Sequence, residues 1–378
     1  MKKQSVIVLG STGSIGRQTL EVLKLHSDRF RLIGISAHRD FETLARQAKA
    51  FSVPYVACTL GGDQEQLPTG TTLFCGANAC ERLAEIPSDV VVLAVLGIAA
   101  LKPLLKAIPN TKRIAIANKE SLVCGGALVD AALKEHHTEL LPIDSEQSAI
   151  FQCLQNGRRE EVSRLILTCS GGPFFRKTEE ELKTVTMEDV LCHPTWRMGR
   201  KITLDSATLF NKGLEVIEAA RLFHLSGEQI SVLIHPQSIV HSMVEYRDGT
   251  VSANLSLPDM RLPIQYALTY PERLESPCTP LRLEQCKDLS FHEASSKALE
   301  LAYAALRAEG GCPIVYNGAN EQAAELFFQN KIAFLDIYRC VEAALSAYRP
   351  SEVGTYAGIE AVDSWARTFV TAYAAQIQ

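Results

Sequence analysis

The run Ser5 to Leu9 is rich in β-branched residues and passes directly into Gly10-Ser-Thr-Gly13-Ser-Ile-Gly16, after which helical spacing continues to Leu25. Strand, glycine turn and helix in this order are typical of a βα unit whose backbone N–H groups and helix N-terminus bind a pyrophosphate. The spacing G-x-x-G-x-x-G differs from the common G-x-G-x-x-G, so a tight turn without a ligand stays an alternative. The feature predicts an opening dinucleotide-binding domain of the α/β class.

The second expected strand, Arg31 to Ser36, is followed closely by His38, Arg39 and Asp40. A carboxylate near this point would bind the ribose hydroxyls of NAD, whereas an arginine suits the 2′-phosphate of NADP. Asp40 lies several residues beyond the expected strand end. Arg39 therefore favours NADP, and Asp40 keeps NAD as the second choice.

Polar clusters follow two later strands of the expected parallel sheet. The expected elements are the strands 89–96, 113–117 and 140–143, with a helix over 97–108. Asn118-Lys-Glu-Ser121 follows the second of these strands and Asp144-Ser-Glu-Gln147 follows the third. Open α/β sheets bind ligands at the carboxyl ends of their strands, so we expect both clusters to border a site.

Asp144 and Glu146 are two residues apart, so in an extended segment their carboxylates point the same way. Such a pair repels itself unless a cation lies between the two groups, and hard oxygen ligands favour magnesium or manganese. The alternative is a helix N-terminus capped by Asp144 or Ser145, with Glu146 in the first turn.

The expected strand Arg164 to Thr168 runs into Cys169-Ser-Gly-Gly-Pro173. The serine and the two glycines predict a second anion-binding loop. Cys169 is the one cysteine placed where it could act as a nucleophile. It supports an alternative function, an NADP-dependent dehydrogenase of the semialdehyde type.

The densest chemistry lies between His193 and Glu215. The part up to Gly199 has proline and glycine and no apolar period, so we expect a loop. A helix follows, with Leu214, Ile217, Ala220 and Leu222 on one buried face. Ser206, Asn211 and Lys212 are residue types that bind phosphate, and Glu215 can lie beside Lys212. The segment is expected to bind a phosphorylated substrate and to give one carboxylate to a metal; a solvated amphipathic helix is the alternative.

The later part of the chain has a different organisation. The strands expected at 231–234, 239–246 and 250–257 include a hairpin at Arg247-Asp-Gly249, and helices are expected at 298–307, 319–329, 336–347 and 359–375. We therefore expect an N-terminal Rossmann-like parallel sheet (1–145), a central α+β catalytic domain (146–270), a linker (271–295) and a C-terminal helical bundle (296–378).

Composition excludes several classes of function. The net charge of −5 and the absence of a long basic run argue against a nucleic-acid partner. The longest uncharged apolar run, between Asp89 and Lys102, is shorter than the roughly 20 residues that span a bilayer. The eleven cysteines are odd in number and contain no C-x-x-C pair. They are expected to be free thiols, which favours a cytoplasmic protein.

These motifs, in this order, resemble the 1-deoxy-D-xylulose 5-phosphate reductoisomerase family. The resemblance extends over nearly the whole chain and rests on Gly10–Gly16, Ala117–Ser121, Asp144–Glu146, Ser170–Phe174, His193–Glu215, His235–Ser238, His241–Met243, Pro258–Met260 and Asn317–Glu321. It implies an NADPH-dependent enzyme of the non-mevalonate isoprenoid pathway. Such an enzyme rearranges the carbon skeleton of a sugar phosphate on a divalent cation and then reduces the resulting aldehyde to 2-C-methyl-D-erythritol 4-phosphate.

The resemblance also implies roles for individual residues. The metal ligands would be Asp144, Glu146 and Glu215, with Mg²⁺, Mn²⁺ or Co²⁺ as the ion, and Lys119 would act with them in catalysis. The substrate would be bound by Lys119, Ser145, Glu146, Ser170, His193, Trp196, Ser206, Asn211, Lys212 and Glu215. The cofactor would be bound by Thr12, Gly13, Ser14, Ile15, His38, Arg39, Asp40, Asn118, Glu120 and Gly199.

Three further expectations come from the same resemblance. Trp196 and Met198 resemble a lid that closes over bound substrate, and the chain is expected to form a homodimer. His38 and Asp40 replace the glycine and asparagine that the family often has near the 2′-phosphate, and Cys169 stands where a glycine is usual. A non-catalytic dinucleotide sensor is a third candidate function, but it gives no reason for three carboxylates and an anion site beside the glycine turn.

Overall fold

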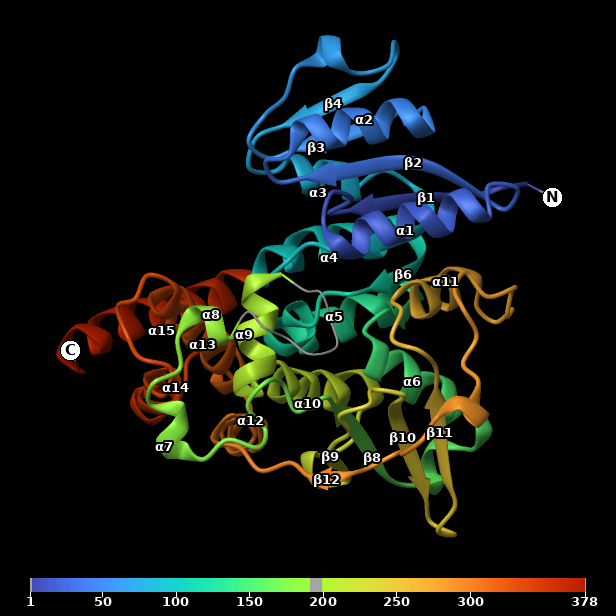
Figure 1. Ribbon diagram of the computed structural model, residues 1–378. Coiled ribbons are helices and arrows are strands. Elements are labelled where there is room, and N and C mark those ends of the chain that lie inside the picture. Colours follow the sequence, from blue (N-terminus) through green and yellow to red (C-terminus); the bar gives the residue numbers. More distant parts are fainter. Residues whose placement is uncertain (1, 191–198, 378) are drawn as a thin grey trace. The chain divides into compact units, whose positions relative to one another are not determined.

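The computed structural model describes residues 2–190 and 199–377 (Figure 1). The described residues form two compact units. Unit 1 comprises Met1–Ser121, Ala127–Ser148 and Asp259–Pro280, and unit 2 comprises Leu122–Gly126, Ala149–Pro258 and Leu281–Gln378. Each unit contains one β-sheet and its own buried apolar residues.

The sheet of unit 1 has seven parallel strands in the order β4-β3-β2-β1-β5-β6-β7. Its strands are β1 Gln4–Leu9, β2 Phe30–Ala37, β3 Tyr55–Cys58, β4 Thr72–Cys75, β5 Ser88–Leu93, β6 Thr111–Ile116 and β7 Glu139–Pro142. β1 pairs with β2 on one side and with β5 on the other, so the strand order reverses between β1 and β5. The carboxyl ends of strands at such a reversal are where doubly wound sheets bind ligands.

The helices of this part of the chain are α1 Ser14–Leu25, α2 Phe41–Phe51, α3 Ala79–Ala84, α4 Leu101–Ala107, α5 Glu120–His136 and α11 Arg261–Thr269. α1 packs on β1 and β2, α11 packs on β6 and β7, and the two helices contact each other. Arg113 of β6 anchors α11, because its guanidinium donates to the carbonyl oxygens of Leu268 (3.1 Å) and Tyr270 (2.8 Å). The segment Asp259–Pro280, which lies far along the chain, therefore belongs to unit 1.

The sheet of unit 2 has five strands in the order β11-β10-β8-β9-β12. They are β8 Val162–Cys169, β9 Ile230–Ile234, β10 Val240–Tyr246, β11 Val251–Leu255 and β12 His292–Glu293. β8 and β9 are parallel, and the other pairs are antiparallel. β10 and β11 form the hairpin expected around Arg247-Asp-Gly249.

Most remaining helices belong to unit 2. They are α6 Ser145–Cys153, α7 Glu179–Leu182, α8 Met187–Val190, α9 Arg200–Thr208, α10 Phe210–Phe223, α12 Lys297–Ala308, α13 Cys312–Phe328, α14 Asp336–Ala347 and α15 Tyr356–Ile377. α6 crosses the unit boundary, which falls after Ser148. α13 is the central helix of the C-terminal bundle, because it packs against α12, α14 and α15.

The predicted fold class is confirmed: a parallel Rossmann-like sheet, a second α+β sheet and C-terminal helices. Two local predictions were wrong, and several elements, including α2, β3, β4 and α5, were not predicted. α13 begins at Cys312 and not near Ala319. The predicted single helix after Gly199 is two helices, α9 and α10, because Leu209 adopts a left-handed φ of 63° between them.

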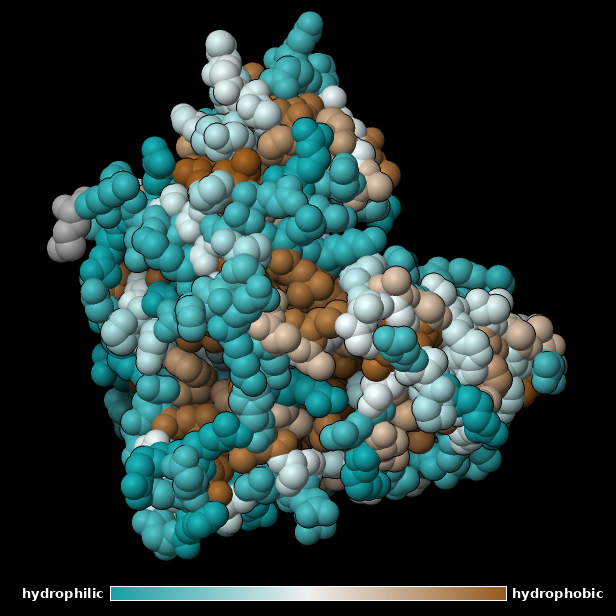
Figure 2. All heavy atoms as spheres, turned by 180° about the vertical axis from the view of Figure 1, so that it is seen from behind, coloured by the Kyte–Doolittle hydropathy of each residue, from teal (hydrophilic) through white to brown (hydrophobic). Residues whose placement is uncertain are grey.

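Among the described residues, no helix is both apolar enough and long enough to span a membrane. The face drawn in Figure 2 is mostly hydrophilic, with separate patches of hydrophobic residues.

Candidate functional site

The glycine turn after β1 has the geometry that an anion-binding helix N-terminus requires. Gly10 has φ 89°, and a Cβ on Gly16 would lie 2.2 Å from the Gly10 carbonyl oxygen, so both positions need glycine. Gly13 is the N-cap of α1, and no side chain caps this helix end. The first N–H groups of α1 are therefore free of side-chain acceptors, and helix N-termini of this kind bind phosphates. Thr12 and Ile15 are half-buried here, and Gly13 and Ser14 are exposed.

The three residues after β2 have different environments. Asp40 caps α2, with its Oδ1 accepting a hydrogen bond from Thr43 N at 3.1 Å. The His38 carbonyl oxygen accepts from Leu60 N, and the His38 side chain is exposed. Arg39 is exposed as well, and its side chain makes no ion pair or hydrogen bond within the described part of the chain. Of the three, only Asp40 has a side chain committed to helix capping.

Asn118 and Glu120 bind the loop that follows β5. Asn118 Nδ2 donates to the Gly97 carbonyl oxygen (3.1 Å) and to Glu120 Oε2 (2.7 Å), while Gly97 N donates to Glu120 Oε1 (3.2 Å). Gly97 has φ 68°, which favours glycine. The loops after β5 and β6 are thus joined at the strand ends where a dinucleotide is expected. Gly97 was predicted to begin a helix, so its contacts with Asn118 and Glu120 were not predicted. A glycine directly after a buried strand was the sequence feature that could have indicated them.

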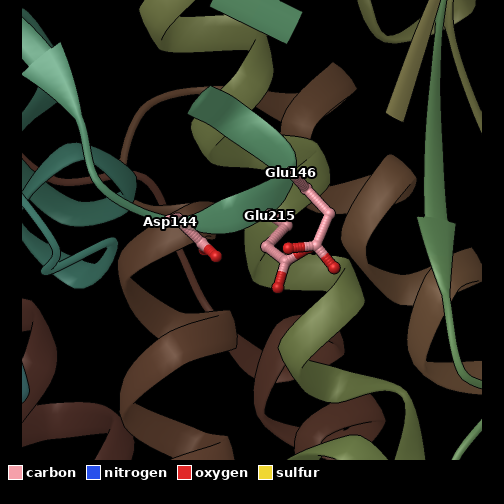
Figure 3. Close-up of side chains that lie close together, drawn as sticks. All are labelled: Asp144, Glu146 and Glu215. Atoms are coloured by element: carbon pink, nitrogen blue, oxygen red, sulfur yellow. The ribbon is translucent and has the colours of Figure 1, made fainter. Parts of the chain in front are cut away.

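Asp144, Glu146 and Glu215 come together in one acidic group. One ligand oxygen of each residue lies within 4.8 Å of the other two, and their side chains converge in Figure 3. Asp144 and Glu146 are half-buried and Glu215 is buried. Three carboxylates this close repel one another strongly unless cations compensate them, and hard divalent ions such as Mg²⁺ prefer such oxygen ligands.

Asp144 and Glu146 reach this group from a helix end and not from an extended segment, so that part of the prediction was wrong. α6 begins at Ser145, and the Asp144 carbonyl oxygen accepts the helical hydrogen bond from Ser148 N (2.8 Å). The backbone has the conformation of the alternative prediction, in which Asp144 is at the N-cap position of a helix and Glu146 lies in its first turn. This conformation does not exclude a metal site, because both carboxylates still face Glu215.

Four of the predicted substrate residues contact these carboxylates directly. Lys119 Nζ lies 2.7 Å from Asp144 Oδ2. Ser145 Oγ donates to Glu146 Oε2 (2.5 Å), and Asn211 Nδ2 donates to Glu215 Oε1 (2.5 Å). Lys212, almost fully buried, forms an ion pair with Glu215 and also donates to the Thr168 carbonyl oxygen (2.6 Å). The two lysines offset part of the negative charge of the group.

The loop after β8 lies against α9. Gly171 and Gly172 have φ 83° and 66°, and Gly172 N donates to Ser170 Oγ (3.2 Å). A Cβ on Gly172 would lie 2.7 Å from the Ser206 carbonyl oxygen. The absence of that Cβ lets the loop of Ser170 approach the helix that carries Ser206. The two serines predicted to bind phosphate therefore lie on neighbouring segments.

The other residues predicted for the site add little to its geometry. Gly199 is the exposed N-cap of α9. His193, Trp196 and Met198 lie outside the described residues. Cys169 Sγ donates to the Leu233 carbonyl oxygen (3.7 Å) in the neighbouring strand β9, which is a structural contact.

Comparison with known proteins identifies one family along most of the chain. Residues 6–126 match the family described as 1-deoxy-D-xylulose 5-phosphate reductoisomerase, residues 140–223 match its C-terminal domain, and residues 255–369 match the domain described as DXP reductoisomerase C-terminal domain. The 1-deoxy-D-xylulose 5-phosphate reductoisomerase of Chlorobium chlorochromatii is 47% identical over 376 residues, covering 96% of this chain and 98% of the relative. That of a Geobacillus species is 46% identical over 374 residues, covering 97% and 98%.

Solved structures with the same name have the same fold. The reductoisomerase from Zymomonas mobilis in complex with NADPH is 40% identical and superimposes with a TM-score of 0.94, covering 99% of both chains. A DOX-P reductoisomerase in complex with NADPH, fosmidomycin and magnesium is 36% identical, with a TM-score of 0.93 and 99% coverage of both chains.

Proposed function

We propose that this chain, which belongs to the 1-deoxy-D-xylulose 5-phosphate reductoisomerase family, converts 1-deoxy-D-xylulose 5-phosphate to 2-C-methyl-D-erythritol 4-phosphate with NADPH as the reductant. The reaction belongs to the non-mevalonate isoprenoid pathway. The observation that carries the proposal is the convergence of Asp144, Glu146 and Glu215, with lysine, serine and asparagine side chains bound to them. The alternative of a semialdehyde dehydrogenase is not supported, since the relatives are reductoisomerases and Cys169 has a structural contact.

Asp144, Glu146 and Glu215 would hold a divalent cation, Mg²⁺ or Mn²⁺, with Co²⁺ as a further choice. A bound cation of this kind polarises the two adjacent oxygens of a hydroxyketone and lowers the pKa of its hydroxyl group. Lys119 lies beside Asp144, where its ammonium group can stabilise negative charge on a substrate oxygen. Ser145 and Glu146 would contact the same end of the substrate. A family member in complex with magnesium supports the choice of metal.

Ser170, Ser206, Asn211 and Lys212 would bind the phosphate. Hydroxyl and amide groups donate to phosphate oxygens, and a lysine supplies a point charge. The close approach of Gly172 to Ser206 supports this assignment, because it places the two serine-bearing segments side by side. By the family resemblance, His193 and Trp196 would also bind the substrate. Trp196 and Met198 would belong to a lid that excludes water from a reactive intermediate.

The cofactor would lie along the strand ends of the parallel sheet. Its pyrophosphate would bind Thr12, Gly13, Ser14 and Ile15 at the N-terminus of α1. Arg39 would bind the 2′-phosphate, with His38 and Asp40 beside it, and Asn118, Glu120 and Gly199 would complete the site. The family member from Zymomonas mobilis was solved with NADPH, which supports this choice of cofactor.

The decisive assay mixes the purified chain with deoxyxylulose phosphate, NADPH and Mg²⁺ and follows the loss of NADPH absorbance, with identification of the methylerythritol phosphate product. We expect turnover that stops after chelation of divalent ions and returns with Mg²⁺ or Mn²⁺. Cys169→Ala should retain this turnover. Absence of NADPH consumption, or turnover that survives chelation, would refute the proposal. A sensor without catalysis would bind NADPH and show no substrate-dependent oxidation.

A second copy of the chain is the proposed partner. β11 and β12 are the edge strands of the five-stranded sheet, and Leu283, Leu289 and Phe291 lead into β12 with exposed side chains. Exposed apolar residues beside open strand edges are typical of an interface. Light scattering after size exclusion should give the mass of a homodimer. Leu283→Glu combined with Leu289→Glu should shift it to a monomer, whereas Leu60→Glu, an exposed leucine of unit 1, should not.

We also propose a main role for each part of the chain. Residues 1–145 would bind NADPH and contribute Lys119, Asp144 and Ser145 to the metal and substrate site, 146–270 would supply most of the other metal and substrate residues, and 296–378 would form the helical domain, with 271–295 as a linker. The cysteines among the described residues are free, which is typical of proteins in a reducing compartment and supports a cytoplasmic location.

A further inference from the structure

The motif from Asn317 to Glu321 is one of several that have no part in the proposed chemistry. Asn317-Gly-Ala-Asn-Glu321 lies in α13, the central helix of the C-terminal bundle. Asn317 and Asn320 are both almost fully buried, at 0% and 1% exposure. Burial of an amide lowers stability unless it is hydrogen-bonded, so two buried asparagines one turn apart need a reason.

Asn320 makes a directed contact with α9. Its Nδ2 donates to Asp205 Oδ1 at 3.0 Å, and Asp205 is itself 3% exposed. The second partner of the Asp205 carboxylate is Lys201, one turn earlier in α9. A hydrogen bond from a neutral amide to a buried carboxylate is strong and sensitive to geometry. It therefore fixes the position and rotation of α9 relative to α13.

Asp205 directly precedes Ser206, which we propose to bind the substrate phosphate. Within a rigid helix, a rotation that moves Asp205 must also move Ser206. The same segment is confined by Gly172, because a Cβ on Gly172 would lie only 2.7 Å from the Ser206 carbonyl oxygen. Asp205 is held by its hydrogen bond to α13, and Ser206 lies against the glycine loop.

α13 also supports α10, but through packing. A Cβ on Gly213 would lie 2.0 Å from the Tyr316 hydroxyl oxygen, so the two helices approach closely beside Lys212. Packing alone permits small rotations of a helix, whereas the bond between Asn320 and Asp205 selects one of them. The hydrogen bond between Asn320 and Asp205 is therefore the contact that selects the orientation of α9.

We infer that Asn320 is a positioning residue for substrate phosphate binding, which it controls through Asp205 by orienting α9 and Ser206. This inference rests on the proposed function. It places one determinant of sugar-phosphate affinity in the C-terminal bundle, on a residue that touches neither substrate nor metal.

The test compares Asn320→Ala with Asn317→Ala, a buried asparagine on the same helix. Within the described residues, its amide donates only to Glu321 (3.4 Å) in its own helix. Asn320→Ala should raise the KM for deoxyxylulose phosphate about tenfold, because a hydrogen bond to a charged group is worth about one decade or more in affinity. The kcat should stay within about twofold, since only uniform binding is lost. The KM for NADPH should change less than the KM for deoxyxylulose phosphate, because Gly199 at the N-terminus of α9 is the one proposed cofactor residue on this helix. Asn317→Ala should lower the melting temperature and leave all three constants unchanged.

A double mutant separates positioning from general damage. In a Ser206→Ala background, Asn320→Ala should add little to the KM, because the two residues act through one contact. If Asn320→Ala folds poorly, the exchange Asp205→Asn with Asn320→Asp restores an amide-to-carboxylate bond and should recover a KM close to that of the natural chain.

The outcomes distinguish this inference from the proposed function. An unmodified chain without turnover overturns both. An active chain in which Asn320→Ala leaves the KM unchanged overturns the inference alone. The inference also fails, and the proposed function stands, if Asn320→Ala raises the KM equally with and without Ser206.

Discussion

Lys212 and Glu215 form a buried ion pair one turn apart in α10, and Lys212 Nζ also donates to the Thr168 carbonyl oxygen at the end of β8. The pair joins the two functions proposed for this helix, because Lys212 is a phosphate ligand and Glu215 a metal ligand. Asn211 binds the other oxygen of the same carboxylate. The negative charge of Glu215 is therefore held in place by two neighbours that the substrate would also contact.

Replacing Lys212 with methionine should weaken substrate binding while keeping most of the packing of the side chain. We expect the KM for deoxyxylulose phosphate to rise about 10- to 100-fold, the range for loss of a hydrogen bond to a charged group. The melting temperature should also fall, because Glu215 is left buried without its lysine. Lys297→Met, which removes an exposed lysine paired with Glu342, is the control and should alter neither value strongly. An unchanged KM in Lys212→Met would remove this lysine from the phosphate site.

Arg39→Ala should reduce the preference for NADPH over NADH. Arg39 is exposed beside the expected 2′-phosphate position, so its loss should raise the KM for NADPH about tenfold or more and leave that for NADH nearly constant. Arg46→Ala is the matched control, because Arg46 is an exposed arginine of α2 that pairs only weakly with Glu42 and has no part in the proposed cofactor site. Steady-state kinetics with both cofactors measure the ratio. An equal change for NADPH and NADH would argue against a 2′-phosphate contact.

Gly16→Ala and Gly13→Ala test the turn at the start of α1. A Cβ on Gly16 would lie 2.2 Å from a backbone oxygen, and backbone cannot move aside as a flexible side chain does. We expect a loss of about 2 kcal/mol or more in the free energy of unfolding, in the range of overpacking. A Cβ on Gly13 meets only the Gly10 carbonyl oxygen, at 3.4 Å, so Gly13→Ala should stay within about 1 kcal/mol. Denaturant titration compares the two, and equal stabilities would contradict the close approach.

Asp89 gives the stability of unit 1 a dependence on pH. Its burial alone would raise the pKa, but hydrogen bonds from Lys112 and from both the amide and the hydroxyl of Ser5 lower the pKa of Asp89 to about 2. Because the folded pKa lies below the ordinary value of 3.8, this contribution is complete above about pH 5. It is lost as the pH falls through about 4 towards 2.

The corresponding variant is Asp89→Asn. It should be less stable than the natural chain by about 1 kcal/mol near neutral pH, since the ion pair is partly exposed and screened. The difference in urea midpoint should shrink as the pH is lowered from about 5 towards 3. A difference that does not vary with pH would show that the carboxylate charge makes no contribution.

The sequence predicted the elements whose pattern is local. The glycine turn, the hairpin at Arg247-Asp-Gly249 and the polar ends of β6 and β7 all follow from turn chemistry or periodicity over a few residues. β3 and β4 were missed because each has only four residues and neither is followed by a cluster of charged residues like the one that marks the end of the equally short β7. The attachment of α11 to unit 1 depends on Arg113, whose partners Leu268 and Tyr270 lie 155 and 157 positions away in the chain.

The candidate site shows the same limit. The residue types of the acidic group were evident from the sequence, but its backbone geometry was not. Asp144 and Glu146 were expected in an extended segment, and a helix begins between them. The contact of Asn320 with Asp205 had no signal in the sequence, since neither residue is unusual in its own helix. Only the tertiary fold, in which a residue of α13 approaches α9, brings them together.

The central claim is that three carboxylates hold one catalytic cation. Glu215→Gln tests it most directly, because it removes one charge and keeps the shape of the side chain. Turnover with Mg²⁺ and NADPH fluorescence titration should be measured on the same preparation. We predict that turnover falls by at least about three orders of magnitude, as for loss of a group essential to the reaction, while the affinity for NADPH is unchanged. Near-normal turnover in Glu215→Gln would contradict the account.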